Sequence, residues 1–249
     1  MLTIAKLHGE SVAYYESTVG NELGQTASES GPDSYYSEDG TKPARAWIAA
    51  RSRAQSERVS VRLGVEIGAE IRGDSVRDWF NKALAPSGEK LGRAPKSTGV
   101  PGFDLTFCAP KSVSVLWGFG SESVRQVVDA AHAQAVSEAL SYLSEHAGYT
   151  RRADDFDRDL MVIDRVEALS GVKYEHRTSR AGDPHVHSHV LLANKQLCAD
   201  GKWRTLDGVS LYHEARAAGM IYQATLREAV TKQFGLAWSD VTNGCAEIA

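Results

Sequence analysis

The segment HRTSRAGDPHVHSHVLL, residues 176–192, contains four of the eight histidines of the chain. From His185 onward, histidine alternates with small or apolar residues, which is the period of a β-strand. Side chains two positions apart on a strand project from the same face. The segment therefore predicts a strand over 185–192 whose His185, His187 and His189 point the same way.

This concentration of imidazoles is typical of a metal site. Neutral imidazole is the commonest protein ligand for a divalent ion, and three ligands that leave coordination positions open describe a catalytic centre. His176 joins the group from a neighbouring strand if 177–184 forms a turn. An exposed polar strand face is the simpler alternative, but four histidines within fourteen residues favour a metal. The spacing leaves two ligand sets open, either His185, His187 and His189 or His176, His187 and His189.

The rest of the chain shows strand and helix patterns that do not alternate regularly. The clearest helix covers 121–146, where apolar residues recur on one stripe. A hairpin is expected from 160–167 and 172–176, with its turn at Ser170-Gly171. Because no βαβ units are evident, an α+β fold with an antiparallel sheet is favoured. Further strands are expected at 2–7 and 103–107, and further helices at 9–18, 75–84 and 210–234.

The composition is that of an ordinary globular protein, with 249 residues, 42% of them hydrophobic. No apolar run approaches the length of a membrane span. The chain has three cysteines and begins without the layout of a secretory signal. A cytoplasmic protein with no membrane insertion is therefore expected.

Charge is distributed unevenly along the chain. The formal net charge of −4 by itself argues against nucleic acid as a partner. However, residues 10–39 contain seven acids and no lysine or arginine, whereas 41–62 carries a local charge of +5. A second basic stretch covers 90–111. If the two basic stretches line one groove, the positive surface for DNA is local rather than global.

Two tyrosine doublets stand near the N-terminus, Tyr14-Tyr15 and Tyr35-Tyr36. Adjacent residues on a helix point about 100° apart, so at most one of Tyr14 and Tyr15 can face a given site if they are helical. A phenol is a poor nucleophile until a base or cation helps it lose its proton. A metal ion can polarise a phosphodiester oxygen. Together these residues suggest transesterification.

The order of these motifs resembles that of a known family. The two tyrosine doublets, then DLTFCAPKSVS at 104–114, then the histidine segment, resemble the MobF-type conjugative relaxases of the HUH endonuclease superfamily, the TraI/TrwC type. The resemblance runs over nearly the whole chain. It implies a palm-like antiparallel sheet flanked by helices. It also implies a site- and strand-specific nickase that cuts one strand at the nic site of a plasmid transfer origin, links to the 5′ phosphate through tyrosine, and later rejoins the ends.

The resemblance also implies a role for individual polar residues. The family's metal ligands match His176, His187 and His189, which leaves His185 outside the ligand set. Asp104 matches an acid that orients the nucleophile or a ligand histidine, because a carboxylate on a ligand imidazole fixes its tautomer. One divalent ion is implied, Mg, Mn or Zn, and three histidines suit Zn or Mn better than Mg.

The tyrosines and two cations receive roles in the same way. Tyr14 matches the nucleophile of the first cleavage, with Tyr15 beside it. Tyr35 matches the tyrosine of a second transesterification, with Tyr36 beside it. Lys111 and Arg180 are the expected contacts to DNA phosphates.

The family also suggests the organisation of the chain and its partners. Residues 1–249 are expected to form a single relaxase domain, with 210–249 as a helical lid region over the DNA. The chain is expected to be the N-terminal piece of a longer protein that ends in a helicase. The implied partners are single-stranded DNA with a nic site and an adjacent hairpin, and other relaxosome and conjugation proteins.

Two other functions remain open on the sequence. A rolling-circle replication initiator of the same superfamily has its nucleophile after the histidines, and Tyr212 and Tyr222 follow His189. The two upstream doublets favour the relaxase order. A small-molecule hydrolase or oxygenase with three histidines on its metal would need no nucleophilic tyrosine and would show little affinity for single strands.

Overall fold

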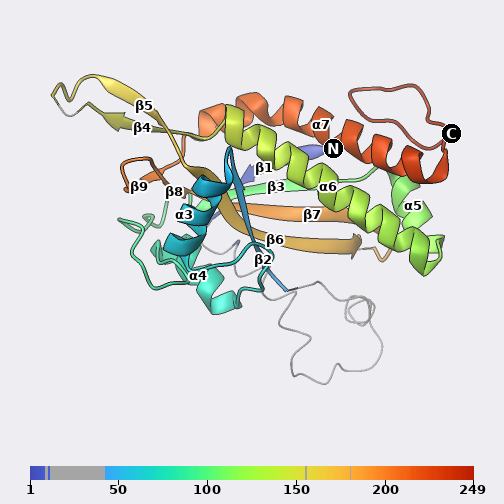
Figure 1. Ribbon diagram of the computed structural model, residues 1–249, viewed down its shortest axis with the longest axis horizontal. Coiled ribbons are helices and arrows are strands. Elements are labelled where there is room, and N and C mark those ends of the chain that lie inside the picture. Colours follow the sequence, from blue (N-terminus) through green and yellow to red (C-terminus); the bar gives the residue numbers. More distant parts are fainter. Residues whose placement is uncertain (9–10, 12–42, 155, 180) are drawn as a thin grey trace.

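A five-stranded antiparallel sheet forms the centre of the computed structural model, which describes residues 1–8, 11, 43–154, 156–179 and 181–249 (Figure 1). Every neighbouring pair in the sheet is antiparallel. The expected α+β fold is therefore confirmed. In spatial order the strands are β1 (Leu2–Lys6), β3 (Gly102–Cys108), β7 (Pro184–Ala193), β6 (Ala168–Thr178) and β2 (Arg45–Ala50).

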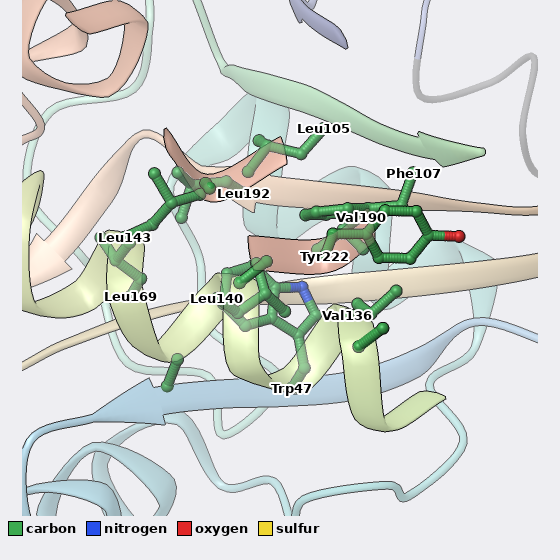
Figure 2. Close-up of a cluster of buried hydrophobic side chains, with 14 of the residues drawn as sticks. Trp47, Leu105, Phe107, Val136, Leu140, Leu143, Leu169, Val190, Leu192 and Tyr222 are labelled. Atoms are coloured by element: carbon green, nitrogen blue, oxygen red, sulfur yellow. The ribbon is translucent and has the colours of Figure 1, made fainter. Parts of the chain in front are cut away.

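Two long helices cover one face of this sheet, α6 (Glu122–His146) and α7 (Gly208–Phe234) (Figure 1). Their apolar stripes and the sheet form the first core cluster, in which each fully buried leucine or valine contributes about 1.5–3 kcal/mol. Figure 2 shows side chains from the sheet, α6 and α7 meeting there, among them Leu105, Phe107, Val136, Leu140, Leu143, Val190, Leu192 and Tyr222.

The opposite face of the sheet is covered by a second apolar cluster, to which α3 (Arg53–Leu63), α4 (Gly73–Lys82) and the segments that connect them contribute side chains. Helix α3 begins where the Ser52 side chain accepts a hydrogen bond from the Gln55 amide, and it ends at Gly64 in the left-handed conformation. Trp79 and Phe80 of α4 are buried in this cluster.

The prediction of a hairpin with its turn at Ser170-Gly171 is wrong. Both residues lie inside β6, which pairs with β2 and β7. A Cβ on Gly171 would lie 1.9 Å from the Leu191 carbonyl oxygen, so glycine is required by close backbone approach rather than by a turn. The strand β5 (Met161–Arg165) pairs instead with β4 (Tyr149–Ala153), and the two form a ribbon that projects from the body (Figure 1).

Several elements of the fold were not expected from the sequence. They are β2, α3 and β4, together with α5 (Lys111–Phe119), β8 (Lys195–Leu197) and β9 (Trp203–Thr205). Of the expected helices, 9–18 lies outside the described residues except for Ser11. No helix in the described part of the chain is both long enough and apolar enough to cross a membrane.

Most of the expected lid region, 210–249, belongs to α7. Leu211, Ala218, Leu226 and Val230 of this helix are buried in the first core cluster, on the sheet face that α6 also covers. After the helix, the chain folds back to α5, where the Glu247 carboxylate accepts hydrogen bonds from two backbone amides of the first helical turn. A covering role over DNA stays a prediction for this region.

Candidate metal and catalytic centre

The pairing of β6 with β7 brings the histidines together. His176 lies directly opposite His187 in the register of the two strands. The ring centroid of His176 lies 5.0 Å from that of His187 and 5.4 Å from that of His189, and the last two are 5.3 Å apart. His185 lies at the edge of this group, with its ring 4.6 Å from that of His187. The strand register therefore favours the set His176, His187 and His189 over three successive histidines of one strand.

Asp104 contacts one of these rings, that of His189, from the neighbouring strand β3. Its carboxylate oxygens lie 2.9 and 3.1 Å from Nδ1 of His189, and the carboxylate is almost fully buried. The Thr106 hydroxyl lies 3.2 Å from the same nitrogen. An Nδ1–H that donates to Asp104 leaves the Nε2 lone pair of His189 available to a cation.

His187 is oriented in a similar way by the backbone. Its Nδ1 lies 2.8 Å from the carbonyl oxygen of His185, so an N–H at this position donates to that oxygen. Burial lowers the pKa of His187 to about 3 and that of His176 to about 4. Both imidazoles are therefore neutral at neutral pH, which is the form that binds metal.

The donor set fits a divalent ion, although its side chains are not yet gathered around one point. Within the described residues, no group of three or more His, Cys, Asp and Glu side chains is already in position to hold a metal ion. The rings of His176 and His187 are stacked, with 16° between their planes, so they must turn before their nitrogens converge. Three imidazoles on two paired strands, one of them in contact with a carboxylate, are ligands that suit zinc or manganese.

The other expected site residues are placed only in part. Tyr14, Tyr15, Tyr35, Tyr36 and Arg180 lie outside the described residues. Lys111 begins α5, and its ammonium donates to the carbonyl oxygen of Pro184 at 3.0 Å, which places it beside His185.

Most of the basic stretch at 41–62 is neutralised by ion pairs. Arg45 pairs with Glu70, Arg53 with Glu57, Arg58 with Glu167 and Arg62 with Glu89. These carboxylates lower the positive potential that the stretch offers to a polyanion. A DNA groove lined by this stretch stays a prediction, and the pairing argues against it.

A buried polar group on the sheet face opposite the three histidines was not predicted from the sequence. His132 of α6 lies between Ser188 of β7 and Tyr222 of α7, with all three side chains in the interior. The sequence held a signal for it, since His132 follows Val128 by four residues and so falls on the apolar stripe of its helix. Ser188 likewise takes an inward position between Val186 and Val190.

The sequence of the chain is similar to those of known conjugation proteins. The model of the TrwC relaxase family matches residues 8–249. The multifunctional conjugation protein TraI of Escherichia coli is 34% identical over 174 residues, which are 64% of this chain and 10% of that protein. TraI of Escherichia coli strain K12 is 30% identical over the same length. The chain thus spans about a tenth of the length of these relatives.

The fold is shared with solved structures of conjugative relaxase TrwC. A metal-bound complex with oriT DNA superposes with a TM-score of 0.75 at 22% identity, covering 100% of this chain and 75% of that one. A complex with a 27-mer that comprises the recognition hairpin and the cleavage site gives 0.74 at 21%, with the same coverage. A copper-bound complex with oriT DNA gives 0.74 at 23%, again with that coverage.

Proposed function

The chain belongs to the TrwC relaxase family, and from this premise we propose that it nicks and rejoins one DNA strand at a plasmid transfer origin. The observation that carries the proposal is the group of His176, His187 and His189 on one sheet face, with Asp104 on His189. Once the rings of His176 and His187 turn toward a common point, this arrangement would hold a cation against a phosphodiester. The TrwC relatives were solved with oriT DNA, one of them with the cleavage site present.

The proposed reaction is a transesterification at phosphorus. The hydroxyl oxygen of Tyr14 attacks the scissile phosphate, and the bond from phosphorus to the 3′ oxygen breaks. The phenol proton passes to solvent or a nearby base, and the leaving 3′ oxygen takes up a proton from solvent. The products are a 5′-phosphotyrosyl ester and a free 3′ hydroxyl. Because one phosphodiester replaces another, the reverse reaction reseals the strand without an energy source. Tyr35 is proposed for a second transesterification, with Tyr15 and Tyr36 beside the two nucleophiles.

The histidines supply the electrostatic part of catalysis. A divalent ion bound by His176, His187 and His189 would withdraw charge from the non-bridging oxygens of the scissile phosphate. Asp104 keeps the His189 ring in the tautomer that presents Nε2. Neutral imidazoles favour zinc or manganese over magnesium, which prefers oxygen ligands.

The DNA partner is proposed to be a single strand with a nic site next to a hairpin. Lys111 and Arg180 are proposed phosphate contacts, and Lys111 lies beside His185 at the histidine end of the sheet. Residues 1–249 are proposed to act as one relaxase domain of a longer protein with a helicase, together with other relaxosome proteins in the cytoplasm, where a plasmid origin is found.

The replication initiator is the less well supported alternative. It requires a nucleophile after His189, and both tyrosines in that part of the chain lie on α7. Tyr222 is buried and its hydroxyl contacts His132, whereas the Tyr212 ring packs against Phe103. Both therefore belong to the sheet face opposite the three histidines, out of reach of a phosphate bound there.

The proposal is tested with a labelled single strand that carries the cognate transfer origin. Incubation with the chain and Mn²⁺ or Zn²⁺ should give a shortened labelled 3′-hydroxyl fragment and a protein–DNA adduct that survives a denaturing gel. A chelator should abolish both products while sparing much of the DNA binding, which depends on phosphate charge and base stacking. Cleavage without an adduct would instead indicate a hydrolase.

A further inference from the structure

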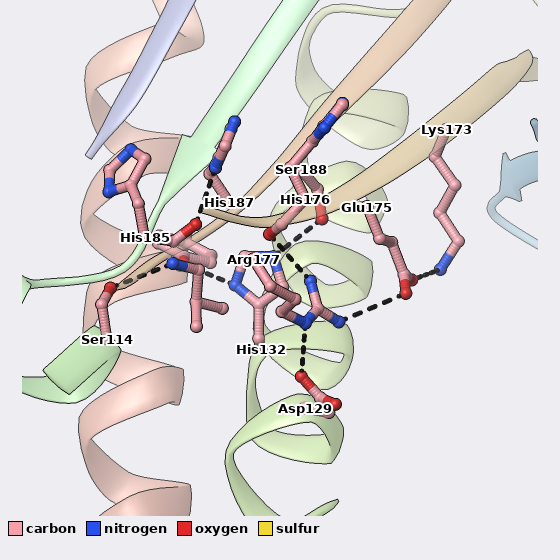
Figure 3. Close-up of polar contacts among 12 residues, drawn as sticks. Ser114, Asp129, His132, Lys173, Glu175, His176, Arg177, His185, His187 and Ser188 are labelled. Carbon is pink, nitrogen blue, oxygen red and sulfur yellow. Dashed lines mark hydrogen bonds and ion pairs between the residues drawn. The ribbon is translucent and has the colours of Figure 1, made fainter. Parts of the chain in front are cut away.

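The imidazole of His132 joins three elements in the interior. Its Nε2 lies 2.8 Å from the hydroxyl oxygen of Ser188 on β7, and its Nδ1 lies 2.8 Å from that of Tyr222 on α7. The exposed fractions of the three residues are 1%, 2% and 0%. Figure 3 shows His132 and Ser188 together on the α6 side of the strands.

Both ring nitrogens of His132 have a hydrogen-bond partner. Burial lowers the pKa of His132 to about 3, so the ring is neutral and has one N–H donor and one acceptor nitrogen. One hydroxyl donates to the ring and the other accepts from it, whichever tautomer is present. Loss of either hydroxyl therefore removes one hydrogen bond from the same buried ring, which makes the two hydroxyls a matched pair.

Only one of the two hydroxyls belongs to the site strand. Ser188 stands between His187 and His189, and side chains alternate between the faces of a strand. A hydrogen bond that holds Ser188 against α6 therefore fixes the roll of β7 at the point where both histidines project. Tyr222 has no such connection, because it comes from the covering helix.

The same helix holds the neighbouring strand behind His176. The guanidinium of Arg177 is buried, and its Nε lies 2.8 Å from a carboxylate oxygen of Asp129. Asp129 precedes His132 by three residues and lies on the same side of α6. Figure 3 shows both contacts on one side of the strands, with the rings of His176 and His187 on the other.

We propose that His132 is a positioning residue for the metal ligands, acting through its hydrogen bond to Ser188. This bond holds β7 so that His187 and His189 can turn onto a common ion with His176. The bond to Tyr222 serves the fold alone. The inference rests on the proposed function, because it assumes that these three histidines bind a metal.

The matched variants Ser188→Ala and Tyr222→Phe separate the two roles. Three quantities are measured on the full chain: Co²⁺ affinity from visible absorption, the melting temperature without metal, and kcat and KM for strand cleavage. Ser188→Ala should weaken Co²⁺ binding by about tenfold, the lower end expected for a partner of ligand residues, and lower kcat with KM unchanged. Tyr222→Phe should lower the melting temperature by about as much as Ser188→Ala does, because each variant removes one hydrogen bond from His132. It should leave Co²⁺ affinity unchanged.

Variants of His132 itself provide a second comparison. The amide of His132→Gln extends to the position of Nε2 and can keep the contact to Ser188, whereas the shorter amide of His132→Asn replaces Nδ1 and can keep only that to Tyr222. The glutamine variant should retain the greater Co²⁺ affinity. If both pairs of variants lose affinity equally, or in proportion to melting temperature, His132 is merely structural and the inference is overturned.

The wild-type chain distinguishes this failure from failure of the proposed function. If it neither binds Co²⁺ nor cleaves DNA, the proposed function is wrong and the inference falls with it. If it does both, and Ser188→Ala matches the wild type in Co²⁺ affinity, only the inference is wrong.

Discussion

The carboxylate of Asp104 lies 2.9 Å from Nδ1 of His189, across the pairing of β3 with β7. The two residues are separated by 85 positions in the chain. Neither is in a local motif with the other, so the contact exists only because the two strands pair. The contact is consistent with the task proposed for this carboxylate, which is to hold one imidazole in the tautomer that can bind an ion.

Replacement of Asp104 by Asn should therefore weaken metal binding. The amide keeps the size of the side chain but loses the charge that favours the Nδ1–H tautomer, and the expected loss of affinity is about 10- to 100-fold. Competition with a chromophoric chelator measures it. Asp240→Asn, at an exposed position near the C-terminus, is the matched control and should leave affinity unchanged. Equal affinity in both variants would exclude an orienting role for Asp104.

The two candidate ligand sets are distinguished by single alanine variants. Because His176 lies opposite His187 and His185 lies at the edge of the group, His176→Ala should abolish metal binding whereas His185→Ala should retain most of it. Bound zinc per chain after dialysis is the measurement. The reverse outcome, with His185 required and His176 dispensable, would establish the set drawn from one strand.

The proposed nucleophile is tested by Tyr14→Phe, which keeps the ring and removes the oxygen. This variant should bind the origin strand but form no covalent adduct in a denaturing gel. Tyr222→Phe is the control, since its hydroxyl is buried behind the sheet, and it should still form the adduct. An adduct that persists in the Tyr14 variant would assign the first cleavage to another tyrosine.

The stability of the metal-free chain should fall in mild acid. Burial lowers the pKa of His132, His176 and His187 from 6.5 to between about 3 and about 4. Below pH 6.5 the unfolded chain therefore takes up protons that the folded chain does not, and each such proton lowers the free energy of unfolding by about 1.4 kcal/mol per pH unit. The loss begins near the unfolded pKa and continues toward the folded values.

Urea unfolding at about pH 7 and at about pH 5 measures this effect. His132→Gln has one titrating group fewer, so its stability should depend less steeply on pH than that of the wild type. Equal stability of the wild type at both pH values would show that these histidines are not buried in the neutral form.

Sequence patterns determined those features that depend on neighbours along the chain. The period of two in 185–192 predicted a strand with three histidines on one face, and β7 has this form. The apolar stripe of 121–146 predicted α6 almost to its ends. The motif order carried the family resemblance, and with it the role that is proposed for Asp104. Each of these depends on the geometry of a single element or on residue order.

Pairing between distant segments decided the rest. Spacing could not choose between the two histidine sets, because the choice depends on the register that places His176 opposite His187. Gly171 resembled a turn in the sequence and proved to be a point where the backbone of β7 leaves no room for a side chain on β6. Some carboxylates that pair with the basic stretch are distant in the sequence, as Glu167 is from Arg58, so the tertiary structure alone reveals these ion pairs. Strand register and ion pairs are set by burial of apolar faces from remote segments, which no local pattern encodes.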